Sequence, residues 1–271
     1  MGTDKTSLGD RMKAYENAHR IKLTPRMPVI LRLDGVAFHT LTKGFVRPLD
    51  RRFVTAMNTT AISLCENVQG ACYAYVQSDE ISILLVDYKN RDSQAWFGKN
   101  LQKMVSVSAS IASTTFTRSL ENMTNKPCRR GWFDSRVIQL PDHEVENYFI
   151  WRQNDCSRNS ILSLGQAHFS HKQLHGKKTP EIIRMLKEDL DVPVVWEDCP
   201  LEQKFGCVVE KVAGPPVKMQ NKKTKQWEDV RRSMWVSTGS HELTSIEGTK
   251  QRLRLREMAF QEEEDTSRTF V

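Results

Sequence analysis

The sequence predicts an α+β fold in which helices back an antiparallel β-sheet, and three features lead to this prediction. Short runs of aliphatic and aromatic residues, typical of buried strands, occur at 28–35, 71–77, 81–86 and 133–140. Two longer segments, 50–67 and 96–113, carry apolar residues at helical spacing instead. The resulting order is the split βαβ arrangement, β-α-β-β-α-β, so we expect a four-stranded sheet backed by two helices.

The first predicted strand ends in an acidic residue and a glycine. It is the mostly apolar run 28–33, which Asp34 and Gly35 follow directly. This order puts a carboxylate at the C-terminal end of a buried strand. Because glycine has no side chain, we expect Gly35 to let a phosphate group approach the backbone.

The second and third strands are expected to form a β-hairpin with an acidic tip. Asp79 and Glu80 lie side by side between the apolar runs 71–77 and 81–86. The two carboxylates cannot both be buried without a cation, because like charges repel and desolvation is costly. A solvated Asp-Glu turn is the alternative interpretation, and the pair alone does not decide between them.

Asp34 gives this hairpin a partner. Mg²⁺ prefers oxygen ligands and usually takes one or two protein carboxylates, with water and substrate phosphate completing its shell. Asp34 and Asp79, on neighbouring strands, would supply that pair. We therefore expect a two-metal site for phosphoryl transfer whose catalytic residues are Asp34, Asp79 and Glu80, with Glu80 supporting the site as a ligand or through hydrogen bonds. The order of these elements is that of a polymerase or nucleotide-cyclase palm.

The remaining elements are predicted from periodicity, caps and chain breakers. We expect an amphipathic helix at 7–20, an N-cap at Asp50, and a loop over the polar stretch 119–130. Asp134 and Arg136 are expected to form a buried ion pair on the fourth strand. The later predicted elements are helices at 148–167 and 179–190, strands at 204–211 and 227–236 joined by a turn at 221–224, and a charged helix with a frayed tail at 250–271.

These elements are expected to group into two parts that pack as one compact unit. Residues 1–140 would form a palm catalytic domain with an N-terminal helix. Residues 141–271 would form a helical RNA-binding extension with a β-appendage, and the run 214–216, Gly-Pro-Pro, is a possible boundary before that appendage.

Composition favours a cytoplasmic protein with a polyanionic partner. The formal net charge is +7, and 39% of the residues are hydrophobic. No apolar run is long enough to span a bilayer, and the first 20 residues lack the apolar core of a signal peptide. The six cysteines form no C-x-x-C pair, which argues against a zinc ribbon or knuckle.

Four ordered motifs closely resemble the tRNA-His guanylyltransferase family. They are Arg32-Leu33-Asp34-Gly35 with Phe38-His39, Gln77-Ser78-Asp79-Glu80, Phe133-Asp134-Ser135-Arg136, and Trp151-Arg152-Gln153-Asn154-Asp155. The resemblance runs from about Arg11 to about Glu210. It implies a nucleotidyltransferase with two Mg²⁺ ions, held by Asp34, the Gly35 carbonyl and Asp79, that uses ATP and GTP or other nucleoside triphosphates.

The resemblance also implies a nucleotide-binding set. In the family, the backbone amides after the first aspartate hold a triphosphate, as an anion nest does. Arg47 matches a family lysine that contacts triphosphate, and Lys103 matches a basic position on a helix. A structural role is the alternative for His39. The expected nucleotide-binding residues are Gly35, Val36, Ala37, Phe38, His39, Arg47, Asp50, Ser78 and Lys103.

Basic and amide residues outside this set are expected to bind RNA. An arginine-rich helix beside aromatic residues suits contact with RNA backbone and bases, and the basic run 169–178 suits phosphate. That run holds two histidines but no third metal ligand, so we favour RNA over metal there. The expected RNA-binding residues are Arg129, Arg130, Arg152, Asn154, Arg158, Asn159, His171, Lys172 and Lys177.

One departure from the family pattern favours the guanylyltransferase-like branch. Enzymes specific for tRNA-His carry a His-Ile-Asn-Asn-Leu-Tyr-Asn run after the matching Asp-Cys, and here only Asn159 is kept. We therefore expect template-directed 3′-to-5′ nucleotide addition to the 5′ end of tRNA or tRNA-like RNA, by a homotetramer as in the family. The alternatives are a strict tRNA-His guanylyltransferase, a palm-type nucleotide cyclase, or an RNA-binding module with a disabled palm.

Overall fold

The computed structural model describes residues 6–220, 223 and 225–259. Its helices are α1 (Leu8–Ala18), α2 (Phe38–Leu41), α3 (Arg51–Asn67), α4 (Leu101–Thr124), α5 (Val145–His168), α6 (His171–Leu174), α7 (Thr179–Glu188), α8 (Leu201–Phe205) and α9 (Ile246–Ala259). Its strands are β1 (Val29–Gly35), β2 (Ala71–Gln77), β3 (Glu80–Leu85), β4 (Phe133–Gln139), β5 (Cys207–Gln220) and β6 (Trp227–Gly239).

The strands form one antiparallel sheet in the order β4-β1-β3-β2-β5-β6. The predicted α+β class and the antiparallel sheet backed by helices are confirmed. The predicted sheet of four strands is too small, because β5 pairs with β2 along Tyr73–Val76 and extends the sheet to six strands. Pairing between segments about 130 residues apart leaves no signal in local periodicity.

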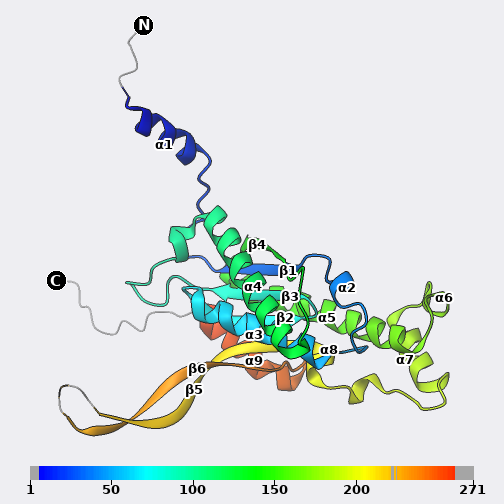
Figure 1. The fold of residues 1–271 in the computed structure, drawn as a ribbon. Helices are drawn as coiled ribbons and strands as arrows, with labels where there is room; N and C mark the ends of the chain where they lie inside the picture. The colour runs from blue at the N-terminus through cyan, green and yellow to red at the C-terminus, as the bar shows by residue number, and fades with distance from the viewer. Residues whose placement is uncertain (1–5, 221–222, 224, 260–271) are drawn as a thin grey trace.

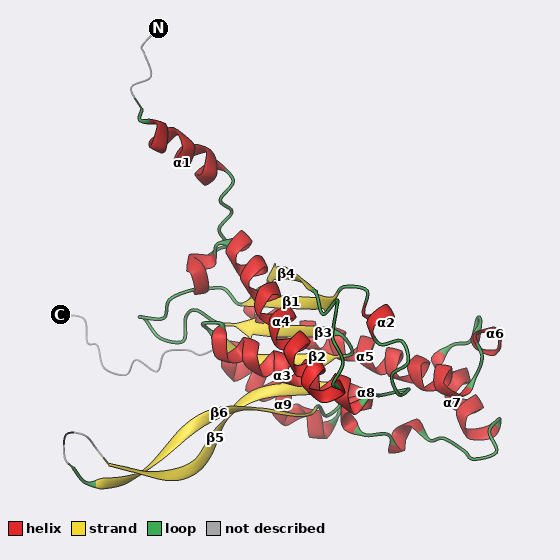
Figure 2. Cartoon of the chain, in the orientation of Figure 1, coloured by secondary structure: helices red, strands yellow, loops and turns green. Residues whose placement is uncertain are grey.

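Alternating side chains divide the sheet into two apolar faces. One face, which includes Leu31, Leu33 and Ile83, packs against α3 and α4. The other, which includes Ile30, Tyr73 and Leu84, packs against α5 and α9. Figure 2 shows α3 and α4 crossing the near face of the sheet. Period-two burial on both faces fixes the register, because a one-residue slip would exchange every side chain between the faces.

The long hairpin of β5 and β6 is continuous with the sheet at one end and extends away from the body at the other (Figure 1). The predicted boundary at 214–216 is wrong: β5 runs through it, and the pairing register shifts between Ala213 and Pro216. Proline has no N–H to donate to the neighbouring strand, and the shift in pairing register accommodates the two prolines. The predicted turn at 221–224 lies almost wholly outside the described residues, as does the predicted tail from 260 onward.

Two further elements differ from expectation or stand apart. The predicted loop at 119–130 is wrong in its first part, because α4 continues to Thr124 and buries Ser119 and Leu120. Helix α1 is capped by Ser7, buries none of its residues and stands away from the body (Figure 1). Among the described residues, no helix is both long and apolar enough to cross a membrane.

Candidate active site

The two predicted metal-binding aspartates come together where β1 ends. Asp34 is paired with Glu80 on β3, and the next amide, that of Gly35, donates a hydrogen bond to the carbonyl oxygen of Asp79 at 3.0 Å. Asp79 belongs to the two-residue turn between β2 and β3, where Ser78 adopts a left-handed conformation with φ of +47°. Non-glycine residues rarely adopt this conformation, and it is found preferentially at functional sites.

Both aspartate side chains are electrostatically disfavoured as a pair of anions. Burial raises the pKa of Asp34, and the charges of Glu80 and Asp134 raise it further. Burial also raises the pKa of Asp79, and the charge of Asp34 adds to this effect. The one cation paired with Asp34 among the described residues is Arg136, whose guanidinium lies 3.8 Å from the carboxylate.

The donor chemistry fits a hard divalent cation. Within the described part of the chain, no group of three or more histidine, cysteine or acidic side chains is arranged around a common point. Soft or tetrahedral metal sites are therefore not built here. Mg²⁺, by contrast, takes only one or two protein carboxylates. A pair of half-buried carboxylates that repel each other is such a set, because a dication between them removes the repulsion.

Glu80 is held by arginines rather than directed at this pair. Its carboxylate accepts hydrogen bonds from Arg152 Nε at 2.7 Å and Arg152 Nη2 at 2.8 Å, and Gln77 Nε2 lies 3.2 Å away. Arg32 Nε lies 3.0 Å from Glu80 Oε2, the oxygen that also accepts from Arg152 Nη2, but Arg32 Nε is not aligned for a hydrogen bond. Glu80 thus joins the hairpin turn to α5, as expected of a supporting residue.

This arrangement corrects the RNA-binding assignment of Arg152. The residue is only 5% exposed, and its guanidinium also donates to Asp155 at 3.0 Å. Arg152 is therefore held inside the protein by two carboxylates and does not project into solvent, where an RNA-binding arginine is expected. The predicted burial of the Asp134–Arg136 pair is also wrong. The two groups are 3.3 Å apart, but both side chains are about half exposed.

The conformation of the loop after Asp34 depends on close packing between Gly35 and the ring of Phe38. A Cβ atom on Gly35 would lie 2.5 Å from the ring of Phe38, which is buried among Phe53, Phe116 and Phe133. The structure therefore gives Gly35 a second reason to lack a side chain, besides the expected approach of a phosphate. Ala37 is left-handed, with φ of +56°, and begins α2. The amides of Gly35 and Val36 already donate to the carbonyls of Asp79 and Trp132, so an anion nest in this loop would use the amides from Ala37 onward.

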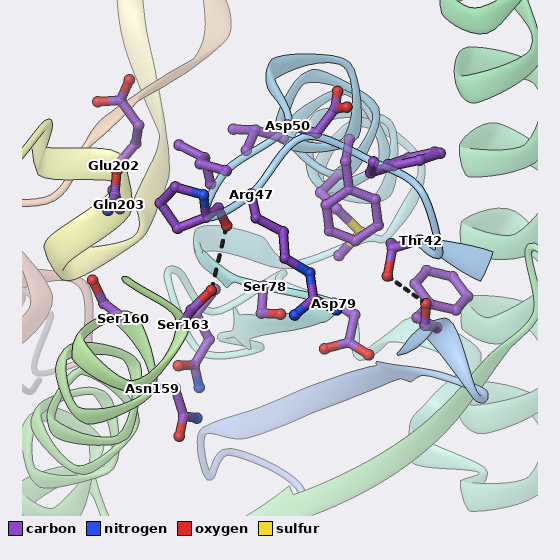
Figure 3. A pocket seen from close by; sticks show the side chains of 18 of the residues that line it. Thr42, Arg47, Asp50, Ser78, Asp79, Asn159, Ser160, Ser163, Glu202 and Gln203 are labelled. Atoms are coloured by element: carbon purple, nitrogen blue, oxygen red, sulfur yellow. Dashed lines mark hydrogen bonds between the residues drawn. The ribbon is translucent and has the colours of Figure 1, made fainter. Parts of the chain in front are cut away.

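A cavity of about 380 Å³ opens beside Asp79. Figure 3 shows Arg47 extending from its loop toward Ser78 and Asp79, with Asn159 and Ser163 of α5 on the opposite wall. Ser163 donates to the carbonyl of Pro48, which closes the cavity between the loop and the helix. Of the predicted nucleotide-binding residues, those that line the cavity are Phe38, His39, Arg47, Asp50 and Ser78.

Asp50 shapes this wall. Its side chain caps α3 by accepting from the Arg52 amide, accepts from the Val46 amide, and is gripped by the Arg52 guanidinium at 2.6 Å. The Arg52 side chain, the largest influence, lowers the pKa of Asp50 far below its usual range. The predicted N-cap is confirmed. Its carboxylate oxygens are already occupied, so Asp50 contributes to the cavity by holding the 46–50 loop in place.

The structure does not bring Lys103 to this cavity. Lys103 lies in the first turn of α4, and the adjacent Lys99 binds Asp87 and the carbonyl of Met27, at the end of the sheet where β1 begins. Asp34 lies near the other end of β1, five residues after Val29, or about 17 Å along the strand. Lys103 does not line this cavity, and its contact with a nucleotide stays a prediction. Val36 is exposed and lies outside the cavity lining.

The other predicted RNA-binding residues are on the surface. Arg129 and Arg130 are exposed in the loop before β4, close to Val36, whose amide donates to the Trp132 carbonyl. A second cavity of about 530 Å³ adjoins Arg47 and is lined by His171 and His175. The remaining predicted residues are all exposed: Asn154, Arg158, Asn159, Lys172 and Lys177.

Sequence reasoning did not single out Trp151, Arg32 or Arg136 as site residues. Arg136 is the cation beside Asp34. Arg32 pairs with Glu80, and the Trp151 ring lies beside both Arg32 and Arg152. The alternation of β1 and β4 was the available signal. Arg32 is two residues before Asp34, and Arg136 is paired with Arg32 across the strands, so all three share one face of the sheet.

Comparison with known proteins gives consistent matches. A family model described as tRNAHis guanylyltransferase matches residues 9–141. The structure of a bacterial tRNA(His) guanylyltransferase-like protein in complex with ATP is 39% identical, with a TM-score of 0.80, and the match covers 94% of this chain and 100% of that one. A second such structure, in complex with GTP, is 37% identical, with a TM-score of 0.72 and the same coverage.

A curated relative matches over a shorter region. The probable tRNA(His) guanylyltransferase of Mus musculus is 31% identical over 144 residues, which are 51% of this chain and 47% of that protein. The shared region therefore spans about half of that relative. The two bacterial structures match nearly the whole chain.

Proposed function

Because this chain belongs to the tRNA(His) guanylyltransferase family, a family of nucleotidyltransferases, we propose that it adds nucleotides in the 3′-to-5′ direction to the 5′ end of tRNA or tRNA-like RNA. The addition is directed by the opposing strand and serves 5′-end repair. The departure of residues 157–163 from the family's tRNA-His motif supports this wider specificity over strict guanylylation.

The observation that carries the proposal is the position of Asp79. It shares the end of β1 with Asp34, and it also lines the cavity of about 380 Å³. Ligand pockets of this kind usually measure about 300–1,000 Å³. A reactive phosphate bound in the cavity would therefore lie beside the acidic pair, which is the requirement for a phosphoryl-transfer site.

The cavity suits a nucleoside triphosphate in both its apolar and its polar parts. Its apolar wall, made by Phe53, Met57 and Val76, suits a base. Arg47, which extends toward Ser78, suits the phosphates, and the left-handed turn at Ala37 leads directly into Phe38 and His39, which line the cavity. The ATP and GTP complexes of the bacterial relatives support nucleotide binding by this chain.

The reaction proceeds in two displacements. The RNA 5′-monophosphate attacks ATP, which releases pyrophosphate and leaves an adenylylated 5′ end. The 3′-hydroxyl of the incoming nucleotide, typically GTP, then attacks that phosphorus and displaces AMP; a 5′-triphosphate end bypasses activation. Asp34, Asp79 and the Gly35 carbonyl would hold two Mg²⁺ ions, which lower the pKa of the attacking hydroxyl and neutralise developing charge. Arg47 and the Ala37 turn align the triphosphate, and Arg152 fixes Glu80 and so the hairpin tip.

A primer-extension assay at the 5′ end tests the proposal. A 5′-truncated, radiolabelled tRNA is incubated with Mg²⁺, ATP and each of four nucleoside triphosphates in turn. We expect addition of whichever nucleotide pairs with the opposing base, and no addition by the Asp79→Ala variant. Addition of guanosine alone, regardless of the opposing base, would support strict guanylylation instead. A cyclic product from GTP without RNA would identify a cyclase.

A further inference from the structure

Trp151 is an exposed aromatic side chain beside Arg32, which lies two residues before Asp34 on β1, and it does not line the nucleotide cavity. It is 52% exposed although it lies on α5, most of whose aromatic residues are buried. The Arg152 guanidinium lies over its ring, 4.4 Å from the centroid, and Tyr148 packs edge-on at 5.8 Å. The indole is thus fixed from within the protein while about half of its surface is open to solvent.

The two arginines around this indole differ in what they bind. Arg152 uses its Nε and Nη2 atoms to bind Glu80 and Asp155, and its side chain is buried. Arg32, whose guanidinium lies 5.9 Å from the Trp151 ring centroid, has one ion pair among the described residues, from its Nε to Glu80. Its two terminal nitrogens make no hydrogen bond within the described chain. A guanidinium with free terminal nitrogens is suited to a phosphate.

These side chains share the open part of one sheet face with Asp34. Arg32 and Asp34 are two residues apart on β1, about 6.6 Å, and both project on the α5 side. On this face α5 buries Tyr75 and Ser82 of the inner strands completely. Towards β4 the face opens, since Arg136 is 54% and Asp34 34% exposed.

We propose that Trp151 and Arg32 bind the 5′-terminal nucleotide of the RNA, with the base stacked on the indole and the 5′-phosphate on the free nitrogens of Arg32. The inference rests on the proposed function, because that reaction needs two reactants at Asp34 and Asp79. The cavity takes the nucleoside triphosphate from one side. The Trp151–Arg32 surface, which does not line that cavity, takes the RNA end from the other.

The surface suits RNA better than a second copy of this chain. Its cationic groups, Arg32 and Arg136, match phosphate, and its aromatic face matches a base of any sequence. Covering it with protein would also block access to Asp34. A protein contact remains an outcome that the test must be able to detect.

The test measures the affinity of the wild type and Trp151→Ala for two RNA hairpins by fluorescence anisotropy. One hairpin carries a normal 5′-terminal nucleotide and the other an abasic one. Loss of base stacking weakens binding by roughly 5- to 100-fold, so we expect the wild type to bind the abasic hairpin that much less tightly. Trp151→Ala should bind both hairpins equally, and Trp151→Phe should restore part of the discrimination.

Two controls make the result specific. Trp227→Ala removes an aromatic residue that is 69% exposed on the distant hairpin, and it should keep the full discrimination against the abasic end. Arg32→Gln is compared on hairpins with a 5′-phosphate and a 5′-hydroxyl, and it should lose the preference for phosphate that the wild type shows. Thermal melting of each variant establishes that it is folded.

Each result bears on a different claim. Undiminished discrimination in Trp151→Ala, with normal nucleotide addition by the wild type, would overturn the docking site and leave the proposed function intact. A change in subunit number in Trp151→Ala, measured by light scattering, with unchanged RNA discrimination would identify a protein contact instead. Absence of nucleotide addition by the wild type would refute the proposed function and, with it, this inference.

Discussion

The amide of Gly35 and the carbonyl oxygen of Asp79 are joined by a hydrogen bond of 3.0 Å. This bond ties the end of β1 to the turn between β2 and β3, so the backbone segments that carry Asp34 and Asp79 are held together. Burial raises the pKa of both carboxyl groups; the charges of Glu80 and Asp134 raise that of Asp34 further, and the charge of Asp34 raises that of Asp79. The account rests on a divalent cation removing the cost of charging both groups.

The first prediction concerns Asp79 in the metal-free protein. Its pKa is raised on folding, so its charged form destabilises the fold at neutral pH, and the cost is relieved as the pH falls through the raised pKa. In EDTA at pH 7, Asp79→Asn should therefore have a higher Tm than the wild type. With Mg²⁺ at a hundredfold excess over its Kd, the wild type alone should gain about 2.7 kcal/mol. Asp191→Asn, at an exposed position, is the control and should change neither value.

The second prediction concerns the buried pair of Glu80 and Arg152. Removing one member of a buried ion pair leaves the other charge without a partner, so Arg152→Met should cost about 3–5 kcal/mol in the free energy of unfolding. The double variant Glu80→Gln, Arg152→Met should recover part of this loss. Arg158→Met, on the same helix but 62% exposed, should cost about 0–1 kcal/mol. Urea denaturation measures all three, and equal losses for Arg152 and Arg158 would contradict the assignment.

The third prediction concerns Gly35 and Phe38. A Cβ atom on Gly35 would lie 2.5 Å from the Phe38 ring, so Gly35→Ala should displace the ring or the turn and cost about 1–3 kcal/mol. Adding Phe38→Leu to Gly35→Ala should reduce this penalty relative to the two separate changes. Thermal denaturation of the four proteins forms a double-mutant cycle. Strict additivity would show that the ring does not impose glycine at this position.

The fourth prediction concerns acid stability. The pKa of Asp50 is lowered, chiefly by Arg52, so its contribution to stability is present above the unfolded pKa of about 3.9 and is lost as the pH falls towards the folded pKa. Asp50→Asn keeps a capping oxygen but cannot ionise. The stability difference between wild type and variant should therefore shrink below about pH 4. Urea midpoints at successive pH values measure it, and a difference independent of pH would exclude the ion pair as its source.

Much of the fold was predictable because its signals are local. Periodicity, turn residues and the order of elements predict the strands β1 to β4, the helices α3, α5 and α7, and the cap at Asp50. They also predict that Asp34 and Asp79 lie close together. Family resemblance added the nucleotide-binding set, and five of its nine residues, Phe38, His39, Arg47, Asp50 and Ser78, line one cavity.

The predictions that were wrong concern features that depend on tertiary structure. The pairing of β5 with β2 depends on distant segments, and the extent of α4 depends on burial of Ser119 and Leu120 rather than on polarity. Arg152 has the charge expected of an RNA-binding residue. It instead forms an ion pair inside the protein, because Glu80 lies opposite it when α5 packs on the sheet. Charge alone cannot tell a buried arginine from one that meets solvent, which is also why Arg32 was overlooked.

Whether Asp34 and Asp79 hold divalent cations can be measured with Mn²⁺ in place of Mg²⁺, because the electron paramagnetic resonance signal of Mn²⁺ changes on binding. The wild type, Asp34→Asn and Asp79→Asn are titrated in the presence of a nucleoside triphosphate. The Mn²⁺ bound by the nucleotide alone is measured without protein and subtracted. Loss of ligands supporting a metal typically costs 10- to 100-fold in affinity, so loss of a direct ligand should cost more than about 100-fold in each variant. Wild-type affinity in both variants would contradict the account.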